Sequence, residues 1–311
     1  MTLEQKNSFP WFTAFIICTS IVMFVILQYS ILGNVDKSSL YSSIGAPYAI
    51  QIYFGQYWGI LTNSVIHISY PHLILNLTAT LILASFLERR MGIMRLFLLG
   101  FFASTITSLV QLTLSNDAGV GLSGVNYFLL AFIIGKNFRN PRYKLKFKQY
   151  YLAFGVLTIA LSYYMNSAFN YTIGVEAMSS GLLIGFLTGW TSELNYKIIP
   201  ILFVATSWVV GITTLFHAPW SAEWNYSQGY EYQLKDDFFQ AKKYYNIALV
   251  LQPNHKVAKE NLYIITTEEL SDKALTAHEN EQYEIAHGYY LELLELDPNN
   301  AWAKDNMSRL P

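Results

Sequence analysis

Seven long apolar stretches constrain the fold of this chain more than any other feature. They cover residues 11–33, 71–87, 93–114, 120–136, 149–166, 172–190 and 197–216. Each is close to the roughly 20 residues that an α-helix needs to cross a bilayer. Hydrophobic residues make up 53% of the sequence and charged residues only 13%, a composition that excludes an ordinary soluble domain. We therefore expect an all-α, polytopic membrane protein in contact with the lipid bilayer.

The distribution of charge divides the chain into two parts. Residues 1–220 carry 12 Lys and Arg and 6 Asp and Glu, a net of +6. Residues 221–311 carry 8 Lys and Arg and 15 Asp and Glu, a net of −7. All seven apolar stretches lie in the first part. The sequence therefore predicts a membrane domain over 1–220 and an acidic, soluble, α-helical domain over 221–311.

The basic residues also predict an orientation in the membrane. Arg89, Arg90 and Arg95 follow the second apolar stretch, and six more Lys and Arg lie between residues 136 and 148. If all seven stretches cross, both groups fall on the same side as the N-terminus, and the positive-inside rule makes that side cytoplasmic. We expect a multi-pass plasma-membrane protein with a cytoplasmic N-terminus and an extracytoplasmic tail.

Small residues open the fourth and sixth stretches. Residues 121–124 read Gly-Leu-Ser-Gly, which places Ser123 like a buried nucleophile at the start of a helix. Gly181 and Gly185 give the sixth stretch a smooth face with four-residue spacing, and such faces allow two helices to approach closely. The two helices could then bring residue 178 to Ser123. Small residues in membrane helices also serve packing alone, which is the structural alternative for Ser123.

Polar side chains mark the start of the second stretch. His72 and Asn76 are four residues apart and therefore share one face of a helix. Polar groups at membrane depth are costly and usually face the protein interior or a water-filled cavity. Two donors on one face could stabilise an oxyanion together with the backbone N–H of Ser123. The alternative is that they only join helices through hydrogen bonds.

In this order, these residues resemble the rhomboid family of intramembrane serine proteases, whose pattern is G-x-S-G on one helix and A-H-x-x-G-x-x-x-G on a later one. The resemblance implies a bundle of six helices, followed here by a seventh span. It implies that Ser123 occupies the nucleophile position. It further implies that the cavity around the serine is formed by Gly121, His72, Asn76 and Tyr127, with Tyr127 matching the tyrosine that stacks on the catalytic imidazole. Glu88 and Arg90 match a structural ion pair of the family.

One position departs from the family pattern, because Met178 stands where the family has its general-base histidine. A serine hydroxyl is a poor nucleophile unless a base takes its proton, and a thioether cannot do so. Removing the histidine from a soluble serine protease costs about a millionfold in turnover. Glu176 is two residues away, which places it about 200° around the helix. We therefore expect a non-functional base position, with Met178 packed against Tyr127.

The acidic tail contains two copies of a helical pattern. Residues 222–255 fit a tetratricopeptide repeat of 34 residues. The sequence Leu-Gln-Pro-Asn at 251–254 recurs as Leu-Asp-Pro-Asn at 296–299, with the prolines 45 residues apart. A helix lengthened by about three turns over 256–279 would absorb the 11 residues that exceed one repeat. Such a tail predicts a surface for peptides or partner proteins, and the alternative is a tail that only packs and solubilises.

The sequence favours a rhomboid-like pseudoprotease that binds membrane-protein segments and recruits partners through its tail. An active intramembrane serine endopeptidase with another base is the alternative from the enzyme class. A plain scaffold without a binding cavity is a third. We expect no metal, nucleotide or other cofactor and no nucleic-acid partner, and the sequence does not indicate the client or the oligomeric state.

Overall fold

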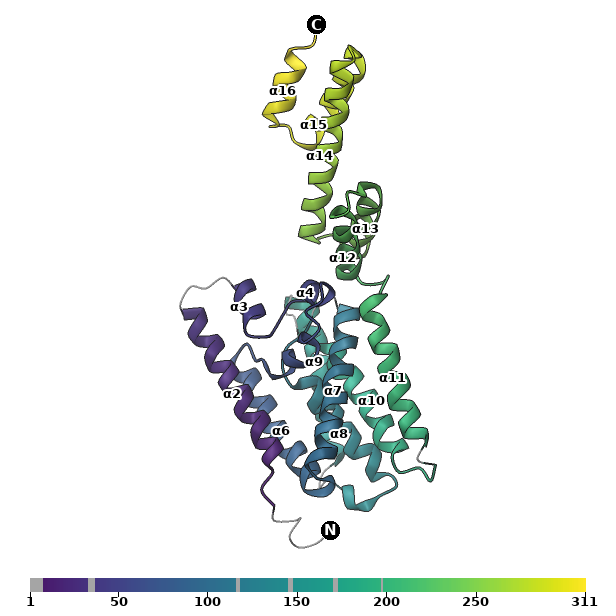
Figure 1. Ribbon diagram of the computed structural model, residues 1–311. Coiled ribbons are helices and arrows are strands. Elements are labelled where there is room, and N and C mark those ends of the chain that lie inside the picture. The colour runs from purple at the N-terminus through teal and green to yellow at the C-terminus, as the bar shows by residue number, and fades with distance from the viewer. Residues whose placement is uncertain (1–7, 33–36, 116–117, 145–147, 170–172, 197) are drawn as a thin grey trace. The chain divides into compact units, whose positions relative to one another are not determined.

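The computed structural model describes residues 8–32, 37–115, 118–144, 148–169, 173–196 and 198–311, and all regular structure within these ranges is helical (Figure 1). The predicted all-α class is therefore confirmed for the described residues. The chain divides by its internal contacts into two compact units, Met1–Ala218 and Pro219–Pro311. Residues 33, 172 and 197, at the ends of three expected spans, and residues 145–147 of the basic segment lie outside the described residues.

A helix lies at the position of each apolar stretch in the first unit. These helices are α2 (Trp11–Leu32), α6 (Tyr70–Met91), α7 (Ile93–Ser115), α8 (Ser123–Asn137), α9 (Lys148–Phe169), α10 (Val175–Thr191) and α11 (Ile198–Phe216). Within the described residues, α2, α6, α7, α9 and α11 are long and apolar enough to cross a membrane. The other two, α8 and α10, have 15 and 17 residues. Five helices thus have the length and composition of membrane spans.

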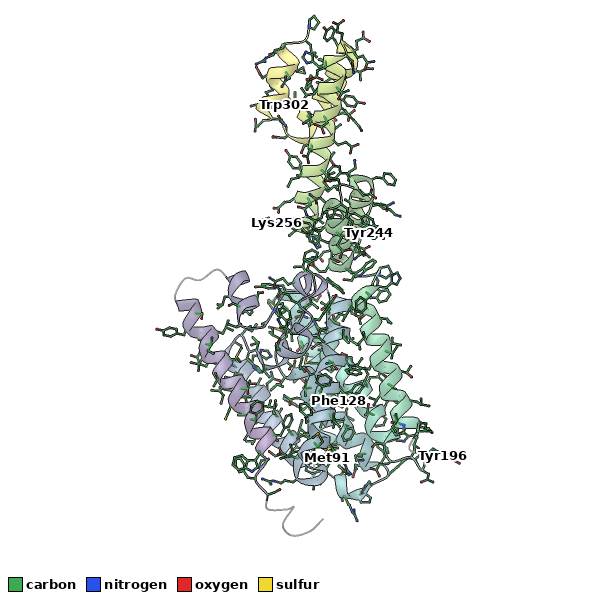
Figure 2. The ribbon with its side chains drawn as sticks, viewed as in Figure 1. Met91, Phe128, Tyr196, Tyr244, Lys256 and Trp302 are labelled. Atoms are coloured by element: carbon green, nitrogen blue, oxygen red, sulfur yellow. The ribbon has the colours of Figure 1, made fainter. Side chains whose placement is uncertain are left out.

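The centre of this unit is α8, which other helices enclose. Its residues from Gly124 to Gly135 are buried, with Tyr127 the exception. Phe128, labelled in Figure 2, is fully buried and packs edge-on against Phe102 of α7 with ring centroids 5.7 Å apart. Residues 118–122 before α8 are non-helical. Within this segment Ala118 and Leu122 are buried, and residues 119–121 are partly exposed.

Helix α10 packs on α8 with almost no side chain between the two backbones (Figure 1). A Cβ atom on Gly185 would lie 2.3 Å from the carbonyl oxygen of Phe128, far inside van der Waals contact. The equivalent distances are 2.5 Å from Gly181 to Gly124 O and 2.2 Å from Gly189 to Phe132 O. Each pair is separated by 57 residues, so the two helices run parallel in constant register. The small-residue face predicted on the sixth stretch is therefore present and faces α8.

Glu88 and Arg90 at the end of α6 do not form the ion pair that the family resemblance implied. Residues two apart on a helix point about 200° away from each other, so their side chains cannot meet. The buried Glu88 carboxylate instead accepts hydrogen bonds at the start of α2, from the backbone N–H of Phe12 and Thr13 at 2.9 Å and from the Thr13 hydroxyl at 2.7 Å. It therefore caps α2, whose first N–H groups have no partner within the helix.

Arg90 contacts a different part of the same end of the bundle. Its Nε donates to the carbonyl oxygen of Arg142 at 2.9 Å, and its guanidinium lies 3.4 Å from the ring centroid of Phe86. Arg142 belongs to the short helix η2 (Pro141–Tyr143) that follows α8. The basic residues after α6 and after α8 therefore gather at one end of the unit. Lys136, near the end of α8, also pairs there with Glu193, which follows α10.

Short helices connect α2 to α6 at the other end of the unit. They are α3 (Lys37–Ser43), α4 (Ala49–Tyr53), α5 (Gly59–Thr62) and η1 (Asn63–Val65). The following long helix α6 begins after Ser69, whose hydroxyl accepts from the backbone N–H of His72, and it carries Pro71 in its first turn. Both features are typical of a helix start. Ser69 and Pro71 therefore fix the start of α6, and this places His72 in the first turn of the helix.

The second unit contains α12 (Ala222–Gln233), α13 (Phe238–Leu251), α14 (Lys256–Glu279), α15 (Tyr283–Leu296) and α16 (Ala301–Ser308). The long helix expected over 256–279 is present with those bounds. The pairs α12–α13 and α14–α15 pack as helical hairpins. Fully buried residues recur at the 45-residue interval of the prolines, with Ala241, Tyr245 and Ala248 in one pair and Ala286, Tyr290 and Leu293 in the other.

Candidate functional site

Ser123 is the first residue of α8 and directly follows the partly buried loop 118–122. Its side chain is partly exposed, whereas Leu122 before it and Gly124 after it are buried. The backbone N–H groups in the first turn of a helix have no acceptor within that helix. The N–H groups in the first turn of α8 are therefore available as donors at the end of the helix where Ser123 lies. The serine therefore stands where a hydroxyl and several N–H donors face the same space.

Gly121 adopts a left-handed backbone, with φ +98°, directly beside the ring of His72. A Cβ atom at this position would lie 2.6 Å from His72 Nε2, so any larger residue would both strain the backbone and displace the imidazole. The predicted cavity residues Gly121 and His72 are thus brought together. His72 lies at the start of α6, and Ser123 is two residues beyond Gly121.

A second imidazole, His67, holds the loop to the start of α8. Its Nδ1 lies 3.2 Å from the carbonyl oxygen of Val65, and its Nε2 accepts from the backbone N–H of Leu122 at 3.5 Å. This pattern requires a neutral ring that carries its proton on Nδ1. Burial, reinforced by the nearby His72, lowers the pKa of His67 to about 4. His67 is therefore a neutral structural group at ordinary pH.

Asn76 joins α6 to α8. Its side-chain oxygen accepts from Asn126 Nδ2 at 3.1 Å, and its own amide nitrogen donates to the carbonyl oxygen of His72 at 3.0 Å. Thr80, one turn further along α6, donates to Asn126 Oδ1 at 2.9 Å. Sequence reasoning missed Asn126 and Thr80, although a polar residue inside the apolar stretch 120–136 was a signal for Asn126. The contacts of Asn76 are therefore those of a residue that joins two helices, which was the structural alternative for this side chain.

Tyr127 lies one turn after Ser123 and faces α9 and α10. Its hydroxyl forms a hydrogen bond with Thr158 of α9, and a Cβ atom on Gly155 would lie 3.5 Å from its ring. On the other side, a Cβ atom on Gly181 of α10 would lie 3.3 Å from Tyr127 Cβ. The tyrosine is therefore wedged into the junction of three helices.

Met178 lies on α10 one turn before Gly181 and is buried, with 4% of its surface exposed. The constant offset between α8 and α10 places residue 178 level with Gly121, at the height at which α8 begins. Its neighbour Ala177 and Ser123 both line one small cavity. Met178 therefore lies near the start of α8, level with a residue two positions before Ser123, and only its neighbour Ala177 shares a cavity with the serine.

The cavity beside Ser123 is small and polar. Its volume is about 20 Å³, enough for one water molecule. Polar side chains from several elements line it, namely Asn63, Ser64, Thr107, Ser108, Gln111 and Ser123. Asn63 is 1% exposed, and its Oδ1 has no hydrogen-bond partner among the described residues. A buried amide oxygen that faces a cavity of this size is a position at which an ordered water would be expected.

Gln111 on α7 is a further residue that the sequence did not reveal. Its Oε1 accepts from the backbone N–H of Ala177 at 2.9 Å, and its Nε2 donates to Ser115 at 2.6 Å. The residue before α10 is Gly174, which has no side chain to cap that helix, so Gln111 supplies the cap from a neighbouring helix. Gln111 therefore holds the end of α10 that carries Met178.

The hydrogen bonds of the described residues show which groups contact Ser123. Within the described residues, no histidine, lysine or carboxylate forms a hydrogen bond with the hydroxyl of Ser123. The described residues also contain no group of three or more His, Cys, Asp and Glu that could hold a metal ion. The described site thus brings a hydroxyl and an imidazole, His72, to the start of α8, without a hydrogen bond between the serine and a basic group among the described residues.

Comparison with known proteins shows what the part of the chain around this site is similar to. Residues 54–195, which include α6 to α10, match the Rhomboid domain family. The chain is 29% identical over 133 residues to the rhomboid protease GlpG of Haemophilus influenzae, 43% of this chain and 68% of that protein. It is 26% identical over 176 residues to that of Yersinia pseudotuberculosis and 23% over 186 residues to that of Enterobacter sp..

The matched regions cover 57% and 60% of this chain and 62% and 64% of these last two relatives, so the chain spans about two thirds of the relatives that it matches. The match includes the loop before α8, the serine at its start and the glycine face of α10. It ends before α11 and the second unit. Residues 54–195, somewhat less than half of the chain, thus match the Rhomboid domain family, and the chain is similar to rhomboid proteases over this part of its length.

Proposed function

We propose that this protein is a proteolytically inactive member of the rhomboid family that binds membrane-protein segments and recruits partners through residues 221–311. The observation that carries the proposal is the residue at the base position. The parallel register of α8 and α10 puts residue 178 level with Gly121, two residues before Ser123, and this residue is a buried methionine. Its thioether cannot take a proton from the hydroxyl.

The size of the expected defect is large. A serine needs an adjacent base to become a nucleophile, and removal of the histidine in a soluble serine protease lowers turnover about a millionfold. His67 is neutral, but its acceptor nitrogen already receives the N–H of Leu122. His72 abuts Gly121, where it is positioned to act as a donor to a bound carbonyl oxygen. Neither imidazole therefore substitutes for the missing base.

The site retains features that favour binding. The left-handed Gly121 keeps the His72 ring beside the start of α8, and the polar cavity at Ser123 remains. Polar groups at membrane depth are costly, so their presence without a catalytic base is best explained by a polar ligand such as the backbone of a bound segment. We propose His72, Asn76, Gly121 and Tyr127 as the residues that shape the binding site at the start of α8, although only Gly121 among them lines the small cavity itself.

The second unit supports a role in recruitment. Its two helical hairpins carry the same buried Ala and Tyr positions at a 45-residue interval, which is the pattern of a repeat that stacks helices. Stacked helical repeats commonly present extended surfaces to peptides or proteins. We propose a tetratricopeptide-like domain over 221–311 that presents such a surface.

The distribution of basic residues supports an orientation. Arg90 and Arg142 contact each other at one end of the membrane unit, and Lys136 lies at that end as well. By the positive-inside rule this end is cytoplasmic. We propose a plasma-membrane protein with a cytoplasmic N-terminus and an extracytoplasmic second unit.

The proposal can be tested with a fluorophosphonate probe, which labels activated serines. We expect no labelling of the wild-type protein in neutral detergent. Met178→His should gain labelling, because residue 178 lies level with Gly121, two residues before Ser123, and a histidine side chain can reach across that distance. Met178→His combined with Ser123→Ala should lose it again, which controls for labelling elsewhere. Cleavage of a transmembrane substrate by the wild-type protein, lost in Ser123→Ala, would refute the proposal.

An active intramembrane serine endopeptidase is the second candidate. It is favoured by the names of the matched relatives, which are rhomboid proteases, and by the two imidazoles that lie close to Gly121. If the wild-type protein is labelled, His72→Ala and His67→Ala identify the base. A base variant should abolish labelling at every pH, whereas loss of a donor should leave weak labelling with the same pH profile.

A further inference from the structure

A groove in the second unit lies between α14 and α16. Its volume is about 560 Å³, and it is open to solvent on one side. It is lined from α14 by Tyr263, Ile264, Thr267, Glu268, Ser271, Asp272 and Leu275, and from the start of α16 by Asn300 and Trp302. Trp302 is labelled on α16 in Figure 2. The groove is therefore built by two helices of a single compact unit.

The floor of the groove exposes large apolar side chains. The exposed fractions are 49% for Ile264, 41% for Tyr263, and 38% for both Leu275 and Trp302. Trp302 is held in place, because its ring packs edge-on against the fully buried Tyr290 with centroids 5.7 Å apart. Rigid, half-exposed aromatic side chains in a hollow are typical anchors of protein interfaces.

The charge of the groove has one sign. Glu268 and Asp272 are one turn apart on α14, are both exposed, and form no ion pair among the described residues. The neighbouring Glu269 differs, because it points away from the groove and pairs with Lys242 and Lys273. Like charges four residues apart on a helix repel each other, so a cation bound between them would be stabilised. The residues that line the groove include no Lys, Arg or His.

We propose that this groove binds a cationic segment of a partner protein, with an apolar side chain on Trp302 and a Lys or Arg between Glu268 and Asp272. The net charge of −7 over 221–311 would draw such a segment toward this unit. Thr267, Ser271 and Asn300 provide hydrogen-bonding groups along the same groove. The inference rests on the proposed role of the second unit as a partner-binding surface, and it does not depend on the chemistry at Ser123.

The test uses the full chain in neutral detergent and two fluorescein-labelled decapeptides. In one peptide Lys alternates with Leu and Ser, and in the other Glu replaces every Lys. Fluorescence anisotropy should show saturable binding of the Lys peptide, weakening as salt is added, and much weaker binding of the Glu peptide. Glu268→Gln with Asp272→Asn should lower the affinity about three- to tenfold, as expected for two exposed ion pairs.

Trp302→Ala should lower the affinity about tenfold or more, because it removes the apolar anchor. The matched control is Glu231→Gln with Glu295→Gln, which removes the same amount of charge from exposed positions outside the groove and should leave binding unchanged. Circular dichroism shows whether each variant is folded. If Trp302→Ala is not folded, the variant Glu268→Gln with Asp272→Asn decides the outcome.

Three results would overturn the inference. The first is equal loss of affinity in the control variant, which indicates general charge attraction. The second is equal binding of the two peptides. The third is self-association of the full chain that Trp302→Ala abolishes, which assigns the groove to a second copy. Serine labelling of Met178→His is scored separately, so failure at the groove is distinguishable from failure of the proposed pseudoprotease site.

Discussion

The close approach of α8 and α10 predicts that Gly185→Ala is strongly destabilising. A Cβ atom at this position would lie 2.3 Å from the carbonyl oxygen of Phe128 and 2.8 Å from its Cα. A carbon and an oxygen in contact lie about 3.3 Å apart, so the two backbones would have to separate by about 1 Å. Both obstacles are backbone atoms, which cannot rotate away as a side chain can.

The expected cost follows from this geometry. Overpacking a well-packed core costs about 1–3 kcal/mol, and the absence of a movable neighbour places Gly185→Ala at the upper end. About 3 kcal/mol corresponds to a fall of roughly 6–12 °C in Tm for a domain of this size. The matched control is Gly100→Ala on α7, where the nearest atom would be Phe12 Cε1 at 3.9 Å. This control should be neutral or stabilising by up to about 1 kcal/mol.

Thermal unfolding in detergent measures the stability term, and serine labelling measures the effect on the site. In the Met178→His background, adding Gly185→Ala should reduce labelling about a hundredfold, because a shift of 1 Å can cost that much when two groups must meet. Adding Gly100→Ala should leave labelling intact. If Gly185→Ala melts at the same temperature as Gly100→Ala, the backbone contact and the register argued from it are refuted.

Three further predictions concern single polar side chains. Glu88→Ala should lower the stability of the membrane unit by about 3 kcal/mol, because it leaves the start of α2 without acceptors, and a double-mutant cycle with Arg90→Ala should show no coupling. Gln111→Leu should lower the stability of the membrane unit by about 1–3 kcal/mol, because it leaves the N–H of Ala177 unpaired. It should also reduce serine labelling in the Met178→His background. Unchanged stability of this variant would contradict the capping of α10 by Gln111. Hydrogen bonds from its two lysine partners lower the pKa of Glu269. The contribution of Glu269 to stability is therefore full above about pH 4.5 and is lost as the pH falls through its lowered pKa. Glu269→Gln should flatten the acid side of a curve of Tm against pH. An unchanged curve would contradict this.

Much of this molecule follows from local pattern. Helices lie at all seven apolar stretches, because length and composition decide whether a segment can satisfy its backbone in a membrane. The four-residue spacing of Gly181 and Gly185 predicts a face that another helix can approach closely, and that face packs on α8. The 45-residue interval between prolines predicts the long helix α14 with its observed bounds. These features depend on residues that are near each other in the chain.

Other features depend on contacts between distant residues, and the pattern did not contain them. Glu88 bonds residues 75 and 76 positions earlier and not Arg90, because the helical turn points the two side chains apart. Gln111 caps a helix that begins more than 60 residues later, because Gly174 leaves that helix without a cap of its own. The burial of α8 on nearly all sides likewise comes from its enclosure by other helices. Periodicity reports which face of a helix is apolar, whereas the partner of a buried polar group is set by how the helices pack, since any nearby donor or acceptor can satisfy it.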